Sequence, residues 1–191
     1  MRKLIVSMNL TLDGYLSGPQ GELDWHVASW TKEMGDALCS QLATTDTILL
    51  GRITYEAMAA YCLSVVSGPT CRDEDFALAN MMNSNTKVVF STTMKKPQWQ
   101  KTLLLRGNLK GEIIRLKKKQ GRNIIVYGSS QLVSGLITEG QVDEYWLWIH
   151  PVVAGKGISF FAKLRDKNYL KLLKTEIFDS GVVLLQYQSI Q

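Results

Sequence analysis

The sequence has few cysteines, few histidines and no long apolar run, and each shortage excludes a class of protein. The 191 residues include three cysteines and two histidines. Cys39, Cys62 and Cys71 are odd in number and lack CxxC or metal-ligand spacing, so we expect reduced thiols, no disulfide framework and no metal site. No apolar stretch approaches the roughly 18 residues that span a bilayer. The N-terminus leads directly into a strand-like segment without the apolar core of a secretory signal, which predicts a cytoplasmic protein without a membrane partner.

The chain also lacks the glycine-rich fingerprint of Rossmann dehydrogenases and the pattern of a nucleic-acid-binding face. Gly128 follows a strand-like segment but lacks the further glycines of that fingerprint. The formal charge is +5, and the densest basic stretch, 115–122, lies at the end of a predicted helix, where cations suit the negative end of the helix dipole. Because no aromatic residues are interleaved with these cations, we predict a solvated helix end and no nucleic-acid partner.

Strand-like and helix-like segments alternate along most of the chain. Helical spacing of Trp30, Met34, Leu38 and Leu42 predicts a helix that ends near residue 44. Further helices are predicted around 55–61 and over 73–82, 109–119 and 132–139, and strands over 4–9, 47–50, 87–91, 102–105 and 124–127. A long strand over 142–153 then precedes two strands, 170–178 and 182–188, that flank a hairpin turn signal. The pattern predicts one α/β domain, residues 1–191, whose mostly parallel sheet ends in an antiparallel hairpin.

Three segments run from a β-branched apolar stretch into small polar or basic residues, namely 47–56, 87–93 and 123–131. Ligands of open α/β sheets bind beyond the carboxyl ends of the strands, where helix N-termini present amides to phosphate. Three such turns therefore indicate a nucleotide.

The first turn combines three features that suit a phosphate. Gly51 lets the backbone approach, Arg52 adds a permanent cation, and Thr54 adds a hydroxyl at the start of the helix. The alternative is an ordinary strand-to-helix turn with a solvent-facing arginine. In the second turn, the hydroxyls of Ser91, Thr92 and Thr93 suit a ribose phosphate, although serine and threonine are also common helix caps.

The third turn contains Gly128, where the absence of a side chain leaves room for a pyrophosphate at the following helix. Ser129 or Ser130 is alternatively an N-cap, with the glycine serving only the backbone geometry.

Five segments resemble, in this order, the bacterial dihydrofolate-reductase-like family: 7–16, 49–56, 89–93, 127–132 and 142–155. The resemblance is to the branch related to the reductase (C-terminal) domain of the bifunctional riboflavin-biosynthesis deaminase/reductase, and it covers nearly the whole chain. It implies a three-layer α/β/α fold with a mixed sheet of about eight strands, a homodimer, and NADPH as the hydride donor.

The resemblance also assigns residues to a site. Ser7 and Met8 would approach the nicotinamide, and the turns described above would hold the phosphates, with the third turn extended to Gln131 and Leu132. Asp13, in a flexible loop over the site, and Glu33, near the start of the helix that carries the substrate carboxylate in folate reductases, are the predicted catalytic residues. Asp13 is alternatively part of a simple turn, and Glu33 fits that role only if the alignment shifts, because Trp30 occupies the corresponding position.

The resulting function is an NADPH-dependent reductase of a small heterocyclic substrate. The resemblance favours 5-amino-6-(5-phosphoribosylamino)uracil reductase of riboflavin biosynthesis; the alternatives are dihydrofolate reductase and a nucleotide-binding protein without catalysis. The apolar residues 145–149, together with Val152, Val153, Phe160 and Phe161, add a sequence argument for the homodimer. His150 is predicted to be structural rather than catalytic.

Overall fold

The computed structural model describes residues 1–67, 73–162, 164 and 166–190. Its strands are β1 (Leu4–Thr11), β2 (Tyr15–Ser17), β3 (Thr45–Gly51), β4 (Thr86–Phe90), β5 (Thr102–Leu105), β6 (Asn123–Val126), β7 (Glu144–His150), β8 (Ile158–Ser159), β9 (Tyr169–Ile177) and β10 (Val183–Ile190). Its helices are α1 (Asp24–Ala28), α2 (Lys32–Ala43), α3 (Arg52–Ser67), α4 (Asp73–Ser84), α5 (Leu109–Lys118) and α6 (Ser130–Thr138).

Eight strands form the central sheet, in the order β5-β4-β3-β6-β1-β7-β10-β9. The strands from β5 to β7 are parallel, whereas β10 runs antiparallel to β7 and β9 antiparallel to β10. The predicted mixed sheet with a C-terminal hairpin is confirmed. Strands β2 and β8 form a separate antiparallel pair. Because β1, β3, β4 and β6 are parallel, their carboxyl ends meet at one edge of the sheet.

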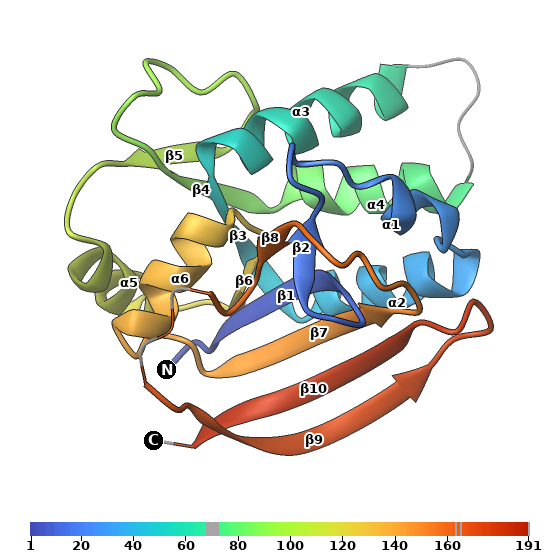
Figure 1. Cartoon of the computed structure of the whole chain (residues 1–191). Coiled ribbons are helices and arrows are strands. Elements are labelled where there is room, and N and C mark those ends of the chain that lie inside the picture. Colours follow the sequence, from blue (N-terminus) through green and yellow to red (C-terminus); the bar gives the residue numbers. More distant parts are fainter. Residues whose placement is uncertain (68–72, 163, 165, 191) are drawn as a thin grey trace.

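Helices cover both faces of the sheet (Figure 1). On one face, Ile5 packs with Met34 and Tyr55, so this core lies under α2, α3 and α4. On the other face, Val6 packs with Ile113 and Val133, which belong to α5 and α6. Adjacent residues of β1 therefore serve opposite cores, which is why this strand is apolar throughout most of its length.

Two element boundaries differ from the sequence prediction. Helix α3 begins directly after β3 and is much longer than the predicted segment, because Tyr55, Ala59 and Cys62 recur at helical spacing and are all buried against the sheet. Strand β7 ends at His150 because the next residue, Pro151, has no N–H to continue the ladder.

The aromatic residues expected at a dimer interface lie instead in the core of the chain. Tyr145, Trp146, Leu147, Trp148 and Phe160 are buried, because β7 is an inner strand covered on both faces. These residues therefore do not form an interface, whereas Val153 and Phe161 of the same predicted set are exposed, and the homodimer itself stays a prediction. The exposed apolar side chains near the C-terminus are concentrated on the edge strand β9: Tyr169, Leu172, Leu173 and Ile177.

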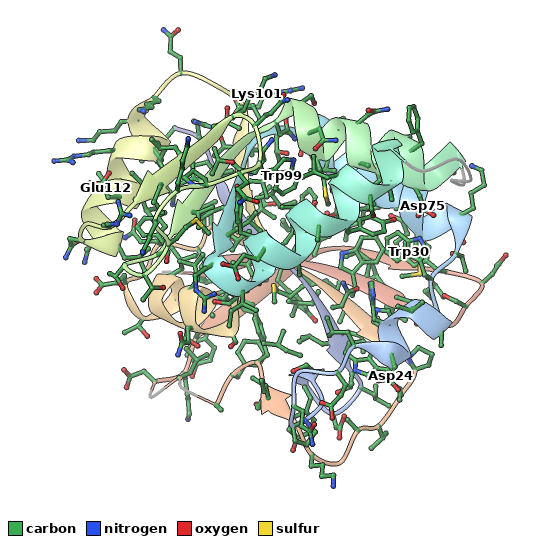
Figure 2. The ribbon with its side chains drawn as sticks, turned by 90° about the horizontal axis from the view of Figure 1, so that it is seen from above. Asp24, Trp30, Asp75, Trp99, Lys101 and Glu112 are labelled. Atoms are coloured by element: carbon green, nitrogen blue, oxygen red, sulfur yellow. The ribbon has the colours of Figure 1, made fainter. Side chains whose placement is uncertain are left out.

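Lys87, on β4, is a fully buried cation. Its Nζ donates to the carbonyl oxygens of Asn83 (2.9 Å) and Met82 (3.2 Å), and lies 4.6 Å from the ring centroid of Trp99. The two carbonyls belong to the last turn of α4, where the helix dipole favours positive charge. Burial, with a smaller contribution from Lys101, lowers the pKa of Lys87 to about 8. Trp99 and Lys101 are labelled in Figure 2.

The described helices include none with both the length and the apolarity required to cross a membrane. Cys39 and Cys62 are free thiols, and Cys71 lies outside the described residues.

Candidate functional site

The predicted first and third turns meet at the edge of the sheet. The amide of Gly51 donates to the carbonyl oxygen of Gly128 over 2.9 Å, which joins the end of β3 to the residues after β6. A Cβ at Gly51 would lie 2.5 Å from Ser129 Oγ, and a Cβ at Gly128 would lie 2.9 Å from Thr54 Oγ1. Gly128 also has a φ of +124°, which L-residues rarely adopt. Both positions therefore require glycine, and the two turns form one continuous cradle.

Helix α6 presents an uncapped N-terminus to this cradle. Ser129 occupies the N-cap position, but its side chain makes no capping hydrogen bond, and the first turn of the helix contains no acidic residue. The partly exposed hydroxyls of Thr54, Ser129 and Ser130 have no hydrogen-bond partner among the described residues. Free amides and hydroxyls at a helix N-terminus are groups suited to bind an anion.

Two further predicted residues of the third turn differ in environment. Gln131 is exposed in the first turn of α6, whereas Leu132 is buried and packs in the core that α5 and α6 share. Leu132 therefore anchors the helix, and only Gln131 has a side chain accessible to a ligand.

The second turn lies beside a basic groove. Ser91 Oγ accepts hydrogen bonds from the amides of Thr93 (3.2 Å) and Met94 (3.0 Å), which tightens the turn after β4, and Thr92 is exposed. A groove of about 690 Å³ runs between this segment and α3, and Arg52 and Thr93 both line it. Lys95 and Lys96 line the same groove and were missed by the sequence analysis, although they directly follow the predicted turn.

The guanidinium of Arg52 is available to an anion. Its Nη1 lies 2.9 Å from a carboxylate oxygen of Glu56, one helical turn further along α3, and both side chains are substantially exposed. Exposed pairs of this kind contribute only about 0.2–1 kcal/mol, so a phosphate can replace Glu56 at little cost.

Ser7 and Met8 have buried side chains on opposite faces of β1. Ser7 Oγ accepts from Trp148 Nε1 (3.2 Å) and donates to Gln41 Oε1 (3.0 Å), whereas Met8 packs in the core under α5 and α6. Their contact with a nicotinamide stays a prediction, and the hydroxyl of Ser7 is already bonded within the protein. Gln41 Nε2, close to this pair, is buried without a hydrogen-bond partner among the described residues.

Asp13 joins two loops at this end of the molecule. Its carboxylate accepts hydrogen bonds from Thr11 Oγ1 (2.7 Å) and from the amides of Ala154 (3.1 Å) and Gly155 (2.8 Å). These bonds, the one from Thr11 first, lower the pKa of Asp13 to about 2. The carboxyl group is therefore ionised at neutral pH, and a catalytic role for it stays a prediction.

Glu33 lies in the exposed first turn of α2. Its carboxylate accepts from the amide of Asp179 in the turn between β9 and β10 over 3.5 Å. The buried residues of α2 are Met34, Gly35, Leu38, Gln41 and Leu42, so this helix directs no carboxylate toward the sheet. Among the described residues, no contact joins the two predicted catalytic acids, Asp13 and Glu33.

His150 is completely buried at the end of β7. Its Nδ1 lies 2.6 Å from Ser29 Oγ and its Nε2 lies 2.9 Å from Asn9 Oδ1. Burial, and to a lesser extent the nearby His26, lower its pKa to about 4, so the ring is neutral at physiological pH. No group of three His, Cys, Asp or Glu side chains in the described part of the chain is arranged to hold a metal ion.

Comparisons with known proteins agree with this architecture. The family model described as the RibD C-terminal domain matches residues 2–184. The chain is 35% identical over 188 residues to the uncharacterized protein YyaP of Bacillus subtilis strain 168, an alignment that covers 97% of this chain and 94% of YyaP.

Among solved structures, a putative riboflavin biosynthesis protein from Shewanella sp. PV-4 is similar with a TM-score of 0.74 and 23% identity, over 99% of both chains. A diaminohydroxyphosphoribosylaminopyrimidine deaminase/5-amino-6-(5-phosphoribosylamino)uracil reductase from Thermotoga maritima gives a TM-score of 0.70 at 16% identity, over 99% of this chain and 57% of that one. Dihydrofolate reductase from Enterococcus faecalis, complexed with NADP(H), gives 0.64 at 17% identity, over 99% and 97%. These similarities confirm the predicted dihydrofolate-reductase-like fold, and with the family match they show that the chain belongs to the RibD C-terminal domain family.

Proposed function

We propose that this protein is an NADPH-dependent reductase of a small heterocyclic substrate, of the type of 5-amino-6-(5-phosphoribosylamino)uracil reductase. The observation that carries the proposal is the cradle formed by Gly51, Thr54, Gly128 and the uncapped N-terminus of α6. Its amides and hydroxyls have no partner among the described residues and can bind an anion. It lies at the carboxyl ends of the parallel strands, where α/β proteins bind nucleotides. Family membership supports reductase chemistry.

The residues present fit a dinucleotide with an additional phosphate. The cradle would hold the pyrophosphate, because glycine at positions 51 and 128 lets the two turns pack closely and brings the hydroxyls of Thr54 and Ser129 to the uncapped start of α6. Arg52, Lys95 and Lys96 in the adjacent groove would pair with a 2′-phosphate on the adenosine ribose, and the turn after β4 would receive that ribose. When bound, the cofactor supplies the hydride.

The protein's own contribution is mainly binding and orientation. Bound phosphates at the ends of β3 and β6 fix the dinucleotide on a rigid sheet, which brings the reacting centres together. The contact between Asp13 and residues 154–155 holds two loops in place beside the end of β1. A heterocyclic substrate would then lie over the end of β1, beside α1 and α2.

Cofactor titration tests the proposal. We expect NADPH to bind more tightly than NADH, because a hydrogen bond to a charged group contributes about 1.5–3 kcal/mol, or roughly 10- to 150-fold in affinity. Arg52→Ala should remove most of this preference, whereas Arg115→Ala should not. Arg115 is a matched control, since it is also a helical arginine paired with a glutamate, at 2.9 Å from Glu112. Equal affinity of the unmodified protein for NADPH and NADH would contradict the proposal.

A substrate panel then separates a reductase from a nucleotide-binding protein without catalysis. NADPH consumption should be measured with 5-amino-6-(5-phosphoribosylamino)uracil, related pyrimidines and dihydrofolate. Oxidation of NADPH with the aminouracil establishes the reaction. If the protein binds NADPH tightly but turns over no pyrimidine, the proposed cofactor site stands and the proposed substrate class is refuted.

A further inference from the structure

The side chain of Asn9 presents an amide group at the carboxyl end of β1. Its Oδ1 lies 2.9 Å from His150 Nε2. Its Nδ2 makes no hydrogen bond to any residue that the structure describes, and it is not among the buried polar atoms without partners. Asn9 is half-buried, so Nδ2 faces accessible space while Oδ1 faces the protein.

The hydrogen bonds of His150 determine which way this amide points. The amide oxygen of Asn9 can only accept, so the Nε2 atom of His150 carries the proton. The neutral ring then leaves Nδ1 as an acceptor, and Ser29 Oγ, 2.6 Å away, donates to it, since this contact is shorter than those of the same hydroxyl to the carbonyl oxygens of Trp25 (3.2 Å) and His26 (3.4 Å). Trp25, whose ring packs edge-on at 4.9 Å between centroids, keeps the imidazole in this position. His150 thus holds Asn9 with its N–H groups directed outward.

Asn9 lies next to the proposed cofactor cradle. Val6 pairs with Val126 at the end of β6, so continuing the register places Asn9 level with the turn at Gly128 and Ser129. In the sheet order, β4, β3, β6 and β1 are consecutive. At about 4.8 Å per strand, the three steps from β4 to β1 span roughly 14 Å. A dinucleotide with its adenosine ribose at β4 and its pyrophosphate between β3 and β6 therefore brings its other ring to the end of β1.

We propose that Asn9 donates an amide N–H to the carboxamide oxygen of the nicotinamide, and that His150 is the positioning residue that orients Asn9 for this bond. The inference rests on the proposed function, because it needs NADPH in the cradle. A ring held by its carboxamide cannot rotate freely about the glycosidic bond. The pair therefore sets which face of the nicotinamide is turned toward the substrate.

Two probes separate this contact from the phosphate site: NADPH, and adenosine 2′,5′-bisphosphate, which lacks the nicotinamide. Asn9→Leu, similar in volume, and His150→Phe, which retains an aromatic ring without the donor, should each weaken NADPH about 2- to 10-fold. Neither should change the affinity for adenosine 2′,5′-bisphosphate. His150→Gln, whose amide can still donate to Asn9, should restore most of the NADPH affinity. The Asn9→Leu/His150→Phe double variant should bind NADPH no more weakly than Asn9→Leu alone.

The outcomes distinguish the two proposals. If the unmodified protein does not bind NADPH, the proposed function fails and this inference fails with it. If it binds NADPH but Asn9→Leu binds equally well, only the present inference is overturned. Equal weakening of both probes would also overturn it, since Asn9 would then be a structural residue. Should a variant not fold, the side-chain amide NMR signal of Asn9 in the unmodified protein decides: NADPH must shift it and adenosine 2′,5′-bisphosphate must not.

Discussion

Replacement of Gly128 by alanine tests whether the cradle binds the cofactor or only connects β6 to α6. The residue has a φ of +124°, and a Cβ there would lie 2.9 Å from Thr54 Oγ1. Holding an L-residue in such a conformation costs about 1–3 kcal/mol. Since domains of this kind have unfolding free energies of about 5–15 kcal/mol, Gly128→Ala should fold but be measurably less stable.

The effect on binding should be larger than the loss of stability implies. The added methyl group must displace the Thr54 hydroxyl or occupy the space beside it, where the pyrophosphate is expected. Loss of one hydrogen bond to a charged group costs about 1.5–3 kcal/mol, so the NADPH dissociation constant should rise at least about 10-fold. Urea unfolding gives the stability, and titration followed by NADPH fluorescence gives the affinity.

Gly140→Ala provides the matched control. Gly140 also has a positive φ, +62°, but a Cβ there meets no atom within 4 Å, and the residue follows the opposite end of α6. This variant should lose about 1–2 kcal/mol of stability and bind NADPH normally. If Gly128→Ala binds NADPH as tightly as Gly140→Ala does, the cradle is a structural turn and the reasoning is refuted.

Three other properties can be predicted. The pKa of buried Lys87 is about 8, against an ordinary 10.5, so between these pH values the unfolded chain binds more protons than the folded protein. The free energy of unfolding, measured in urea, should therefore rise from pH 8 to 10.5 by up to about 3 kcal/mol. Lys87→Met should abolish this rise, and an unchanged slope would contradict the assignment. We propose that two copies associate through the edge strand β9, whose apolar side chains are exposed. Light scattering should give the mass of a dimer, and Ile177→Lys should convert the dimer to a monomer. A monomeric mass for the unmodified protein would refute this proposal. Dihydrofolate should be a poor substrate and antifolates weak ligands, because Glu33 is exposed and α2 directs no carboxylate toward the sheet; efficient turnover that is lost in Glu33→Gln would show the opposite.

Much of the fold could be predicted because the inner strands are apolar on both faces. In β3 and β6, short β-branched runs are each followed by a glycine and a helix, and this local pattern identifies strand, turn and helix together. Helix α3 was underestimated because its apolar residues, such as Ala59 and Cys62, show little contrast with their neighbours. Packing against the sheet, rather than a strong amphipathic pattern, sets its length.

The candidate site likewise has parts that the sequence predicts and parts that it does not. The three turns at the strand ends could be predicted because each is a continuous piece of sequence with its own phosphate chemistry. The pairing of Asn9 with His150 could not, since 141 residues separate them and only the register of β1 against β7 brings them together. Neither residue alone indicates the pair, because asparagine and histidine are both common in structural roles.

The prediction that the aromatic residues of β7 face a partner was wrong for a related reason. Alternating aromatic residues in β7, such as Trp146 and Trp148, look like a strand with one face available to a partner. In the sheet, β7 lies between β1 and β10, and helices and loops cover both of its faces. Whether a strand is inner or outer depends on the order of pairing, which no single segment specifies.

The titratable groups around the site bear on how a reduction here would be completed. Asp13 is ionised and accepts three hydrogen bonds, and both nitrogens of neutral His150 are already engaged. Glu33 lies in an exposed turn against the hairpin. Asp13 is ionised, the proton of His150 is held by Asn9, and α2 directs no carboxylate toward the sheet, so we expect water to deliver the proton that accompanies hydride transfer. The candidate site consists of glycine turns, a helix N-terminus and the side-chain amide of Asn9. With such groups, we expect the rate to depend on how the rigid sheet orients the nicotinamide and not on a side-chain acid with a shifted pKa.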